Sequence, residues 1–354
     1  MTESQKRIPM TANDFQPSLS IDYPLDKIGS WPASKHRFDE DSILAVRTAL
    51  ACNRPLLVRG EPGIGKSQLA RAVATYFEVP FLSFVVTSRS ECSDLLYFYD
   101  AVSRLSQAQV QRHAGDHDGD WRAELAEEKF VRPGKLWWAI NWESAALQAR
   151  RSCPHCRGKT DSHECCPQCG EPERGSLNGW KPGMGCVLLI DEIDKADSDF
   201  PNGLLESLGN TGFEVSEARC SVQADIHSPP PLVMVTTNED RELPPAFLRR
   251  CLVLQMVLGS PDKTPQQFLV DRGKIHCSDI AAAVHEAVAQ LVLDERGRQK
   301  EALCKPGAAE HLDILQALRE LYGHDKKRAE EEQLKALKYV AKFSLNKNYQ
   351  APTN

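Results

Sequence analysis

The sequence Gly-Glu-Pro-Gly-Ile-Gly-Lys-Ser at residues 60–67 constrains the fold of this chain more than any other segment. It matches the pattern G-x-x-x-x-G-K-S/T, and it lies between an apolar segment and a segment with apolar residues at helical spacing. In such a loop, backbone N–H groups face phosphate groups, and the N-terminus of the next helix adds partial positive charge. The motif therefore predicts a site for a nucleoside triphosphate with Mg²⁺, in which Lys66 contacts the β- and γ-phosphates and Ser67 binds the metal. The residues expected to form the site are Gly60, Glu61, Pro62, Gly63, Ile64, Gly65, Lys66 and Ser67.

Short apolar segments alternate with helical patterns along the first two thirds of the chain. The expected strands lie at 55–58, 80–86, 185–190 and 231–237. The expected helices include 39–50, before the first strand, and 67–76, between the first two strands. This alternation predicts an α/β fold, with a parallel sheet covered by helices on both faces. Three later segments with apolar residues at helical spacing predict a small C-terminal helical domain; they are 279–293, 308–322 and 326–343.

The composition is that of an ordinary globular protein, and it argues against several classes. Charged residues make up 26% of the chain and the formal net charge is −6, which argues against binding nucleic acid through a bulk positive field. No apolar run approaches the ~20 residues of a membrane-spanning helix. Residues 1–10 are polar and lack the apolar core of a signal peptide, so we expect a cytoplasmic protein. We expect residues 1–30 to form an extension that packs loosely or lies on a neighbour.

Polar side chains suited to phosphate chemistry follow two of the expected strands. Asp191 and Glu192 end the third strand; Asp191 is expected to reach Mg²⁺, and Glu192 to act as a general base on the attacking water. Asn238 ends the fourth strand, where a neutral amide can hold that water and sense the γ-phosphate. Further along, Arg249 and Arg250 offer guanidinium groups that could reach the nucleotide of a neighbouring subunit.

Five of the twelve cysteines lie within residues 153–169, in a segment that has no Val, Ile, Leu, Met, Phe, Trp or Tyr. Two C-P-x-C turns in this segment are typical of zinc knuckles, and four thiolates form a closed tetrahedral set suited to a structural zinc. The expected ligands are Cys153, Cys156, Cys166 and Cys169, with Cys165, His155 and His163 as alternatives. A set of free thiols and a redox disulfide pair are the competing interpretations.

In this order, the motifs resemble those of the AAA+ ATPases, and within them those of the MoxR-like group. The resemblance covers roughly residues 38–322, and the stretches that carry it are Gly60–Ser67, Pro133–Leu136, Leu189–Asp197 and Glu242–Arg250. It implies an α/β core of the P-loop NTPase type and a division of the chain into segments. These are an N-terminal extension (1–37), the ATPase core (38–258) with a helix-2-type insert (94–134) and a zinc-knuckle insertion (150–182), and a C-terminal helical lid (259–354).

The resemblance also implies a role for each candidate residue. Asp191 would be the Walker B magnesium residue, Glu192 the catalytic base and Asn238 the sensor-1 residue. Arg250 would be the arginine finger, with Arg249 as the alternative.

Two further segments have weaker matches to the family pattern. Lys305 is the nearest match to the sensor-2 residue of the lid, which is usually an arginine. The run Leu95–Tyr99 lies in the insert that faces the ring pore in the family; it would either contact a substrate or pack on the core.

The resemblance implies an ATP-hydrolysing protein that forms a hexameric ring and remodels or activates partner proteins. In this family the partner usually carries a von Willebrand factor A domain. One alternative is a nucleotide-gated scaffold with little turnover, which the presence of Glu192, Asn238 and Arg250 disfavours. The other is a DNA-associated motor, which the acidic charge disfavours. ATP turnover with and without Glu192→Gln separates the remodelling ATPase from the scaffold. Stimulation of turnover by DNA would indicate the DNA-associated motor.

Overall fold

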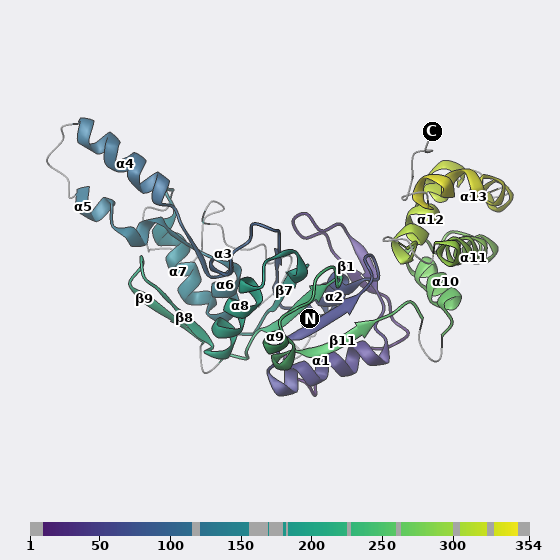
Figure 1. Ribbon diagram of the computed structural model, residues 1–354, viewed down its shortest axis with the longest axis horizontal. Coiled ribbons are helices and arrows are strands. Elements are labelled where there is room, and N and C mark those ends of the chain that lie inside the picture. Colours follow the sequence, from purple (N-terminus) through teal and green to yellow (C-terminus); the bar gives the residue numbers. More distant parts are fainter. Residues whose placement is uncertain are drawn as a thin grey trace, which may run out of the picture.

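The computed structural model describes residues 10–114, 121–155, 169, 180–181, 183–224, 228–259, 263–299, 305–323 and 329–345. Its centre is a five-stranded sheet in the order β11-β3-β10-β7-β4, in which every pair of neighbours is parallel (Figure 1). The strands are β3 (Leu56–Gly60), β4 (Phe81–Val85), β7 (Val187–Asp191), β10 (Leu232–Thr237) and β11 (Leu252–Met256). The predicted α/β fold is therefore confirmed.

The register of the three central strands decides what lies at the carboxyl edge of the sheet. Val235 of β10 pairs with Leu57 of β3 on one side and with Ile190 of β7 on the other. Because parallel strands run in the same direction, the segments that follow Gly60, Asp191 and Thr237 emerge at one edge. The four strands expected from the sequence are present, whereas β11 at the sheet edge was not expected.

Helices α1 (Glu40–Cys52) and α2 (Lys66–Phe77) flank the strand that leads into the phosphate-binding motif. Helix α1 packs on β3 and β11, and α2 packs on β3, β4, β7 and β10. Helix α1 begins with a capping box, in which the Asp39 side chain accepts a hydrogen bond from the Ser42 N–H.

The N-terminal residues that the structure describes pack into the same core. Strands β1 (Tyr23–Leu25) and β2 (Ser34–His36) form an antiparallel pair. The Phe15 ring is completely buried, and it lies edge-on against the rings of Phe38 and Tyr76. Burial of one phenylalanine contributes about 1.5–3 kcal/mol. The expectation of a loosely packed extension is therefore wrong for residues 10–30, because apolar side chains anchor this segment.

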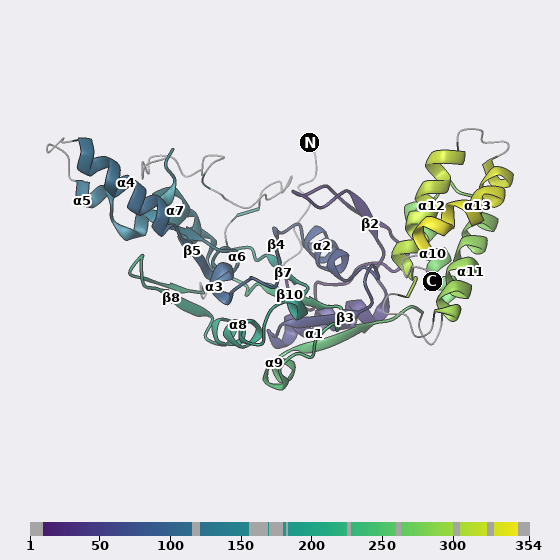
Figure 2. The ribbon, with the colours of Figure 1, turned by 45° about the horizontal axis from the view of Figure 1, so that its top comes forward.

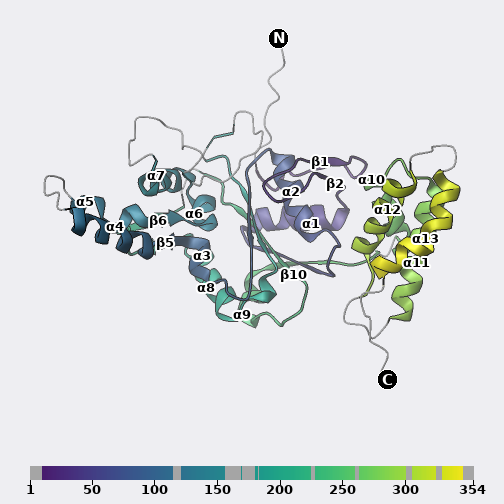
Figure 3. The same ribbon diagram turned by 90° about the horizontal axis from the view of Figure 1, so that it is seen from above.

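A large excursion separates β4 from β7. It contains α3 (Cys92–Leu96), β5 (Tyr97–Tyr99), α4 (Ala101–Ala114), α5 (Trp121–Glu124), the 3-10 helix η1 (Glu127–Phe130), β6 (Val131–Pro133), α6 (Lys135–Ile140) and α7 (Trp142–Ser152). Helices α4 and α5 lie at the opposite end of the molecule from the C-terminal helices (Figures 1 and 3). Within the run Leu95–Tyr99, Leu95 is completely buried while Phe98 is 55% exposed, so the run both packs on the core and presents a ring to solvent.

Between β7 and β11 the chain forms a second set of short elements. They are the 3-10 helix η3 (Ile193–Lys195), α8 (Asp199–Gly209), the hairpin of β8 (Gly212–Val215) and β9 (Cys220–Gln223), and α9 (Pro245–Arg250) after β10.

Four C-terminal helices form a bundle with its own buried core (Figure 2). They are α10 (Pro265–His276), α11 (Ala282–Arg298), α12 (Ala308–Tyr322) and α13 (Ala329–Leu345). The last three match the predicted helices, and α10 was not expected. No helix among the described residues is both long and apolar enough to cross a membrane.

Candidate nucleotide site

The phosphate-binding loop connects β3 to α2 and depends on glycine for its conformation. Gly60, Gly63 and Gly65 have φ values of +147°, +76° and +104°, which side chains other than hydrogen rarely allow. A Cβ on Gly60 would also lie 2.4 Å from the carbonyl oxygen of Met256 on the neighbouring strand. The loop therefore holds a backbone shape that other residues would strain.

Lys66 is 7% exposed, and its ammonium lies inside this loop. It donates hydrogen bonds to the carbonyl oxygens of Gly60 and Glu61 at 2.6 and 2.9 Å, and to Oδ1 of Asn238 at 2.7 Å. Burial lowers the pKa of Lys66 below its ordinary value, and the neighbouring carboxylates, with Asp191 the largest contributor, act in the opposite direction. The sequence predicted both residues, and the structure brings the loop and the end of β10 together through this ammonium.

Asp191 lies at the end of β7 and faces the first turn of α2. Its Oδ1 atom accepts a hydrogen bond from the Ser67 hydroxyl at 2.8 Å and another from the Thr236 hydroxyl. The Thr236 oxygen in turn accepts the N–H of Glu192 at 2.9 Å. Sequence reasoning missed Thr236, because a threonine inside a strand is ordinary and carries no separate signal.

Glu192 has a left-handed backbone conformation with φ of +61°. One oxygen of its carboxylate, Oε2, forms a hydrogen-bonded ion pair with Lys195 in η3. This hydrogen bond raises the pKa of Lys195.

The buried carboxylate of Asp194 organises the turn after β10. Its Oδ2 atom accepts the backbone N–H groups of Asn238 at 3.2 Å and Asp240 at 2.9 Å. These bonds fix the backbone at Asn238 and leave its side-chain amide to meet Lys66. Sequence reasoning did not single out Asp194.

The predicted finger residues lie away from this loop. Arg249 and Arg250 end the short helix α9, and both side chains are exposed. Neither the exposure nor the position tests their roles, which stay predictions.

The C-terminal helices contact the phosphate-binding loop through residues that the sequence analysis did not select. Arg272 of α10 donates a hydrogen bond to the carbonyl oxygen of Ile64, and burial lowers its pKa to about 10. Arg296 of α11 forms an ion pair with Glu61. The predicted sensor-2 residue, Lys305, is exposed.

Helix α12 reaches the same loop at its first turn. A Cβ on Gly63 would lie 2.5 Å from the Cβ of Ala309, and a Cβ on Gly65 would lie 2.0 Å from a guanidinium nitrogen of Arg272. Gly63 is thus needed for close approach of α12 as well as for backbone conformation, whereas the flexible end of Arg272 could move away from a side chain at position 65.

The predicted zinc ligands are described only in part. Cys153 and Cys169 are buried and belong to the same core cluster, whereas Cys156 and Cys166 lie outside the described residues, as do Cys165 and His163. Among the residues that the structure describes, no group of three or more His, Cys, Asp or Glu side chains is arranged to hold a metal ion.

The donor set fits a nucleotide with magnesium. The loop offers backbone N–H groups at the start of α2, and Lys66 offers a cation that now binds neutral acceptors. Ser67 and Asp191 bring a hydroxyl and a carboxylate within 2.8 Å of each other, and both are oxygen ligands that Mg²⁺ prefers.

Comparison with known families decides the classification. Residues 55–251 match the family model of the AAA domain, dynein-related subfamily. The chain belongs to this AAA family. The match begins just before β3 and ends just after α9, so it includes the loop, Asp191, Asn238 and both candidate finger residues, and it leaves out the C-terminal helices.

Comparisons of the AAA-family chain with whole proteins add little to this classification. A search of curated protein sequences found no match. Among solved structures, the Thermotoga maritima RuvB Holliday junction branch migration motor matches with 13% identity and a TM-score of 0.41, covering 84% of this chain and 67% of that one. A single-substitution variant of the same motor matches with 12% identity and a TM-score of 0.42, covering 93% and 72%. Likenesses this weak carry no argument about what the present chain acts on.

Proposed function

We propose that this AAA-family protein binds ATP with Mg²⁺ and hydrolyses it to ADP and phosphate. The observation that carries the proposal is a cluster of two hydrogen-bonded pairs, Lys66 with Asn238 and Ser67 with Asp191, which meet at the start of α2 because Lys66 and Ser67 are adjacent. The cluster gathers residues that follow or end three adjacent strands, β3, β10 and β7. A cation, a metal-binding pair and a neutral amide are thereby held within one site.

Each residue has a distinct task in the proposed reaction. The loop N–H groups and Lys66 bind the phosphates, and Ser67 and Asp191 hold Mg²⁺, which when bound offsets the negative charge on the β- and γ-phosphate oxygens. Asn238 orients the attacking water, and Glu192 accepts its proton. A γ-phosphate that draws Lys66 away from Asn238 would also free that amide for the water.

Replacement of Glu192 by Gln tests the hydrolytic part of the proposal. The amide cannot accept the proton, so we expect turnover to fall about 10²–10⁴-fold. ATP affinity should change little, because Glu192 is not among the phosphate or Mg²⁺ ligands. Phosphate release and the binding of a fluorescent ATP analogue measure the two quantities.

Glu214→Gln is the matched control, because this exposed glutamate lies on the β8–β9 hairpin and takes no part in the site. Wild-type turnover in Glu192→Gln would show that the base is assigned wrongly. Negligible turnover of the wild-type protein, with tight ATP binding, would favour the nucleotide-gated scaffold. Strong stimulation by DNA would favour the DNA-associated motor.

We also propose that the protein acts as a ring, of MoxR type and hexameric, in which Arg250 of one subunit completes the site of the next. The exposure of Arg250 and Arg249 supports this arrangement, because a finger that acts on a neighbour must lie on the surface. Remodelling of a client, with a von Willebrand factor A domain protein as partner, follows from the MoxR-like motifs alone. Co-purification with the Glu192→Gln protein, which is expected to retain ATP, is the direct way to capture such a partner.

A structural zinc held by Cys153, Cys156, Cys166 and Cys169 is a further part of the proposal. It is supported by the burial of Cys153 and Cys169, the first and last of the four, because ligands of a closed structural site are shielded from solvent. Zinc binding can supply about 10 kcal/mol or more of folding free energy to a segment that lacks apolar residues.

Elemental analysis should therefore find about one zinc per chain. The double replacement of Cys166 and Cys169 by Ser should release the metal, while Cys165→Ser and Cys52→Ser should retain it. Cys52 is exposed and lies at the end of α1, which makes it a suitable control. Protein free of zinc, or zinc lost in the Cys165 variant alone, would contradict the assignment.

A further inference from the structure

Arg54 lies between the end of α1 and the start of β3, and its side chain binds the backbone of a distant segment. Its Nε atom donates to the carbonyl oxygen of Arg250 at 3.0 Å. One terminal nitrogen donates to the carbonyl oxygens of Arg249 and, at 3.3 Å, of Cys251. One guanidinium thus binds three consecutive carbonyl groups almost two hundred residues further along the chain.

These carbonyl groups lie where a helix leaves its acceptors unsatisfied. Helix α9 ends at Arg250, and the last carbonyl groups of any helix lack partners within it. A cation at this end is favoured because the helix dipole is negative there. Arg54 therefore fixes the backbone of Arg249 and Arg250 while their own side chains remain exposed.

The chain on either side of these contacts is also fixed. The N–H of Leu252 donates to the carbonyl oxygen of Pro55 at 2.9 Å, and Leu252 pairs with Leu56 at the start of the β11–β3 ladder. The Cys251 side chain is buried. The segment that presents the two arginines is consequently attached to the strand that leads into the phosphate-binding loop.

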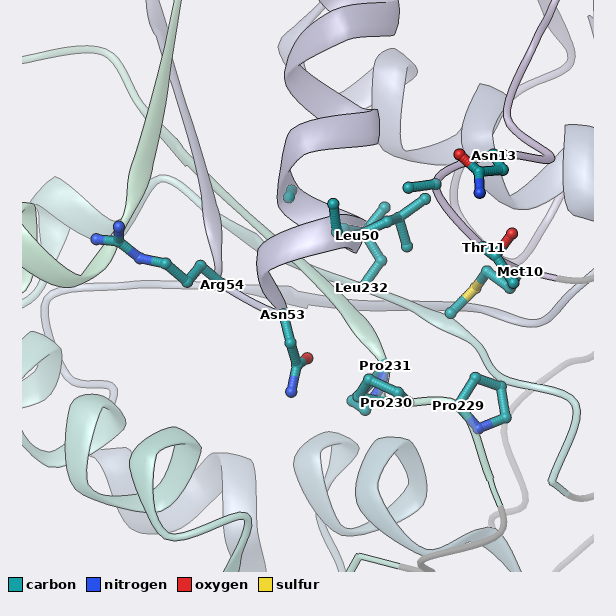
Figure 4. A pocket seen from close by; sticks show the side chains of 13 residues that line it. Met10, Thr11, Asn13, Leu50, Asn53, Arg54, Pro229, Pro230, Pro231 and Leu232 are labelled. Atoms are coloured by element: carbon teal, nitrogen blue, oxygen red, sulfur yellow. The ribbon is translucent and has the colours of Figure 1, made fainter.

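Arg54 also borders a cavity formed by residues near the N-terminus, the end of α1 and the start of β10, but it is not directed into it. Figure 4 shows its side chain extending away from Met10 and from Pro229, Pro230 and Pro231, which line the other side of the cavity. Its donors are used by α9 instead. A role in binding a ligand in this cavity does not explain that geometry.

We propose that Arg54 is a positioning residue that sets the direction in which the finger arginine projects toward the nucleotide of the neighbouring subunit. The proposal rests on the finger proposed above for Arg250 or Arg249. A displacement of about 1 Å in a reacting group can cost about 10²-fold in rate. Loss of the three hydrogen bonds would therefore impair catalysis in the adjacent subunit and leave the Arg54 subunit's own site intact.

Arg54→Met keeps most of the side-chain length and removes the donors. We expect kcat for ATP to fall about 10- to 100-fold, with KM changed by no more than about twofold. The kcat of Arg54→Lys should lie between those of the wild type and Arg54→Met, because one ammonium does not reproduce the planar guanidinium fork. Arg47→Met is the matched control: Arg47 lies on α1, seven residues before Arg54, and donates to the carbonyl oxygen of Ala12 rather than to α9.

Mixed rings distinguish a positioning role from a merely structural one. Arg54→Met subunits are co-assembled with Glu192→Gln subunits, which have an inactive site and an intact finger, and rings that carry both affinity tags are isolated. Turnover per Arg54→Met subunit should rise at least about fivefold above that of pure Arg54→Met rings, because neighbours now supply a correctly placed finger. In a parallel experiment, Arg250→Ala subunits are co-assembled with Glu192→Gln subunits. Rescue of turnover there reports whether a finger acts between subunits at all.

The mixed rings test the positioning role of Arg54 and the finger role of Arg250 separately. Rescue of Arg250→Ala without rescue of Arg54→Met and Arg54→Lys would overturn the positioning role and leave the finger intact. Rescue of none of these variants in verified mixed rings would remove the finger, and the positioning role with it. Unchanged turnover in folded Arg54→Met protein, with a melting temperature close to that of Arg47→Met, would also overturn the role.

Discussion

Replacement of Arg250 by Ala should lower ATP turnover by about 10³–10⁵-fold, the range typical of an arginine finger. The guanidinium offsets charge that develops on the transferred phosphoryl group. ATP binding by the isolated subunit should remain near normal, because Arg250 is exposed at the end of α9 rather than within the loop. Single-turnover phosphate release and equilibrium binding of ATP measure the two effects separately.

Arg249→Ala is the matched variant for this experiment, since the two arginines are adjacent and both exposed. It should reduce turnover by far less than Arg250→Ala. A large loss in Arg249→Ala with little loss in Arg250→Ala would reverse the assignment. Little loss in either variant would mean that the chain uses no finger from this helix.

Replacement of Lys66 by Ala should weaken ATP binding about 10²–10⁴-fold. Two charge-assisted hydrogen bonds to the phosphates contribute about 1.5–3 kcal/mol each, and each 1.4 kcal/mol is about tenfold in affinity. The change also leaves the carbonyl groups of Gly60 and Glu61 and the amide of Asn238 without the donor that now binds them. Isothermal titration with a non-hydrolysable ATP analogue and Mg²⁺ measures the loss.

Lys335→Ala provides the control for a lost positive charge, because Lys335 lies on α13 and pairs with Glu331 at the surface. It should bind nucleotide with wild-type affinity. Near-normal affinity in Lys66→Ala would show that phosphates bind elsewhere, despite the geometry of the loop.

The elements that the sequence predicted are those with a strong local signal. The strands β3, β7 and β10 each begin with a run of buried apolar residues, as is typical of strands covered on both faces. Strand β11 carries a usable signal, since four of its five residues are apolar, and its place at the edge does not explain why it was missed, because β4 lies at the other edge and was predicted. Helix α10 was also missed, although the sequence contains a signal for its start. Thr264 and Gln267 form a capping box, and proline follows at the first helical position.

Within the candidate site, residues that belong to a local motif were predicted, and residues that reach the site through long-range packing were not. Lys66 and Ser67 follow from a motif whose spacing is fixed by the phosphates, and Asp191 and Asn238 follow from the ends of apolar strands. Arg272 meets the loop only through the packing of the helical bundle, 208 residues away in sequence, so no local pattern could indicate it. Lys305 was predicted from its position in a family pattern. Such a pattern does not show which cation of the C-terminal helices packs on the loop, and in this structure Arg272 does so.

The contacts of Arg272 and Ala309 with the loop offer a physical route by which nucleotide binding and the position of the C-terminal helices would be linked. A nucleotide that alters the preferred conformation of the loop would then shift the position that these helices prefer. By reciprocity, a subunit or partner that holds the helices in one position would change nucleotide affinity by the same factor. Such coupling is typically about 1–3 kcal/mol, or roughly 5- to 150-fold in affinity. A protein that binds α12 or α13 more tightly in one of these positions would then change nucleotide affinity, although it touches no atom of the nucleotide.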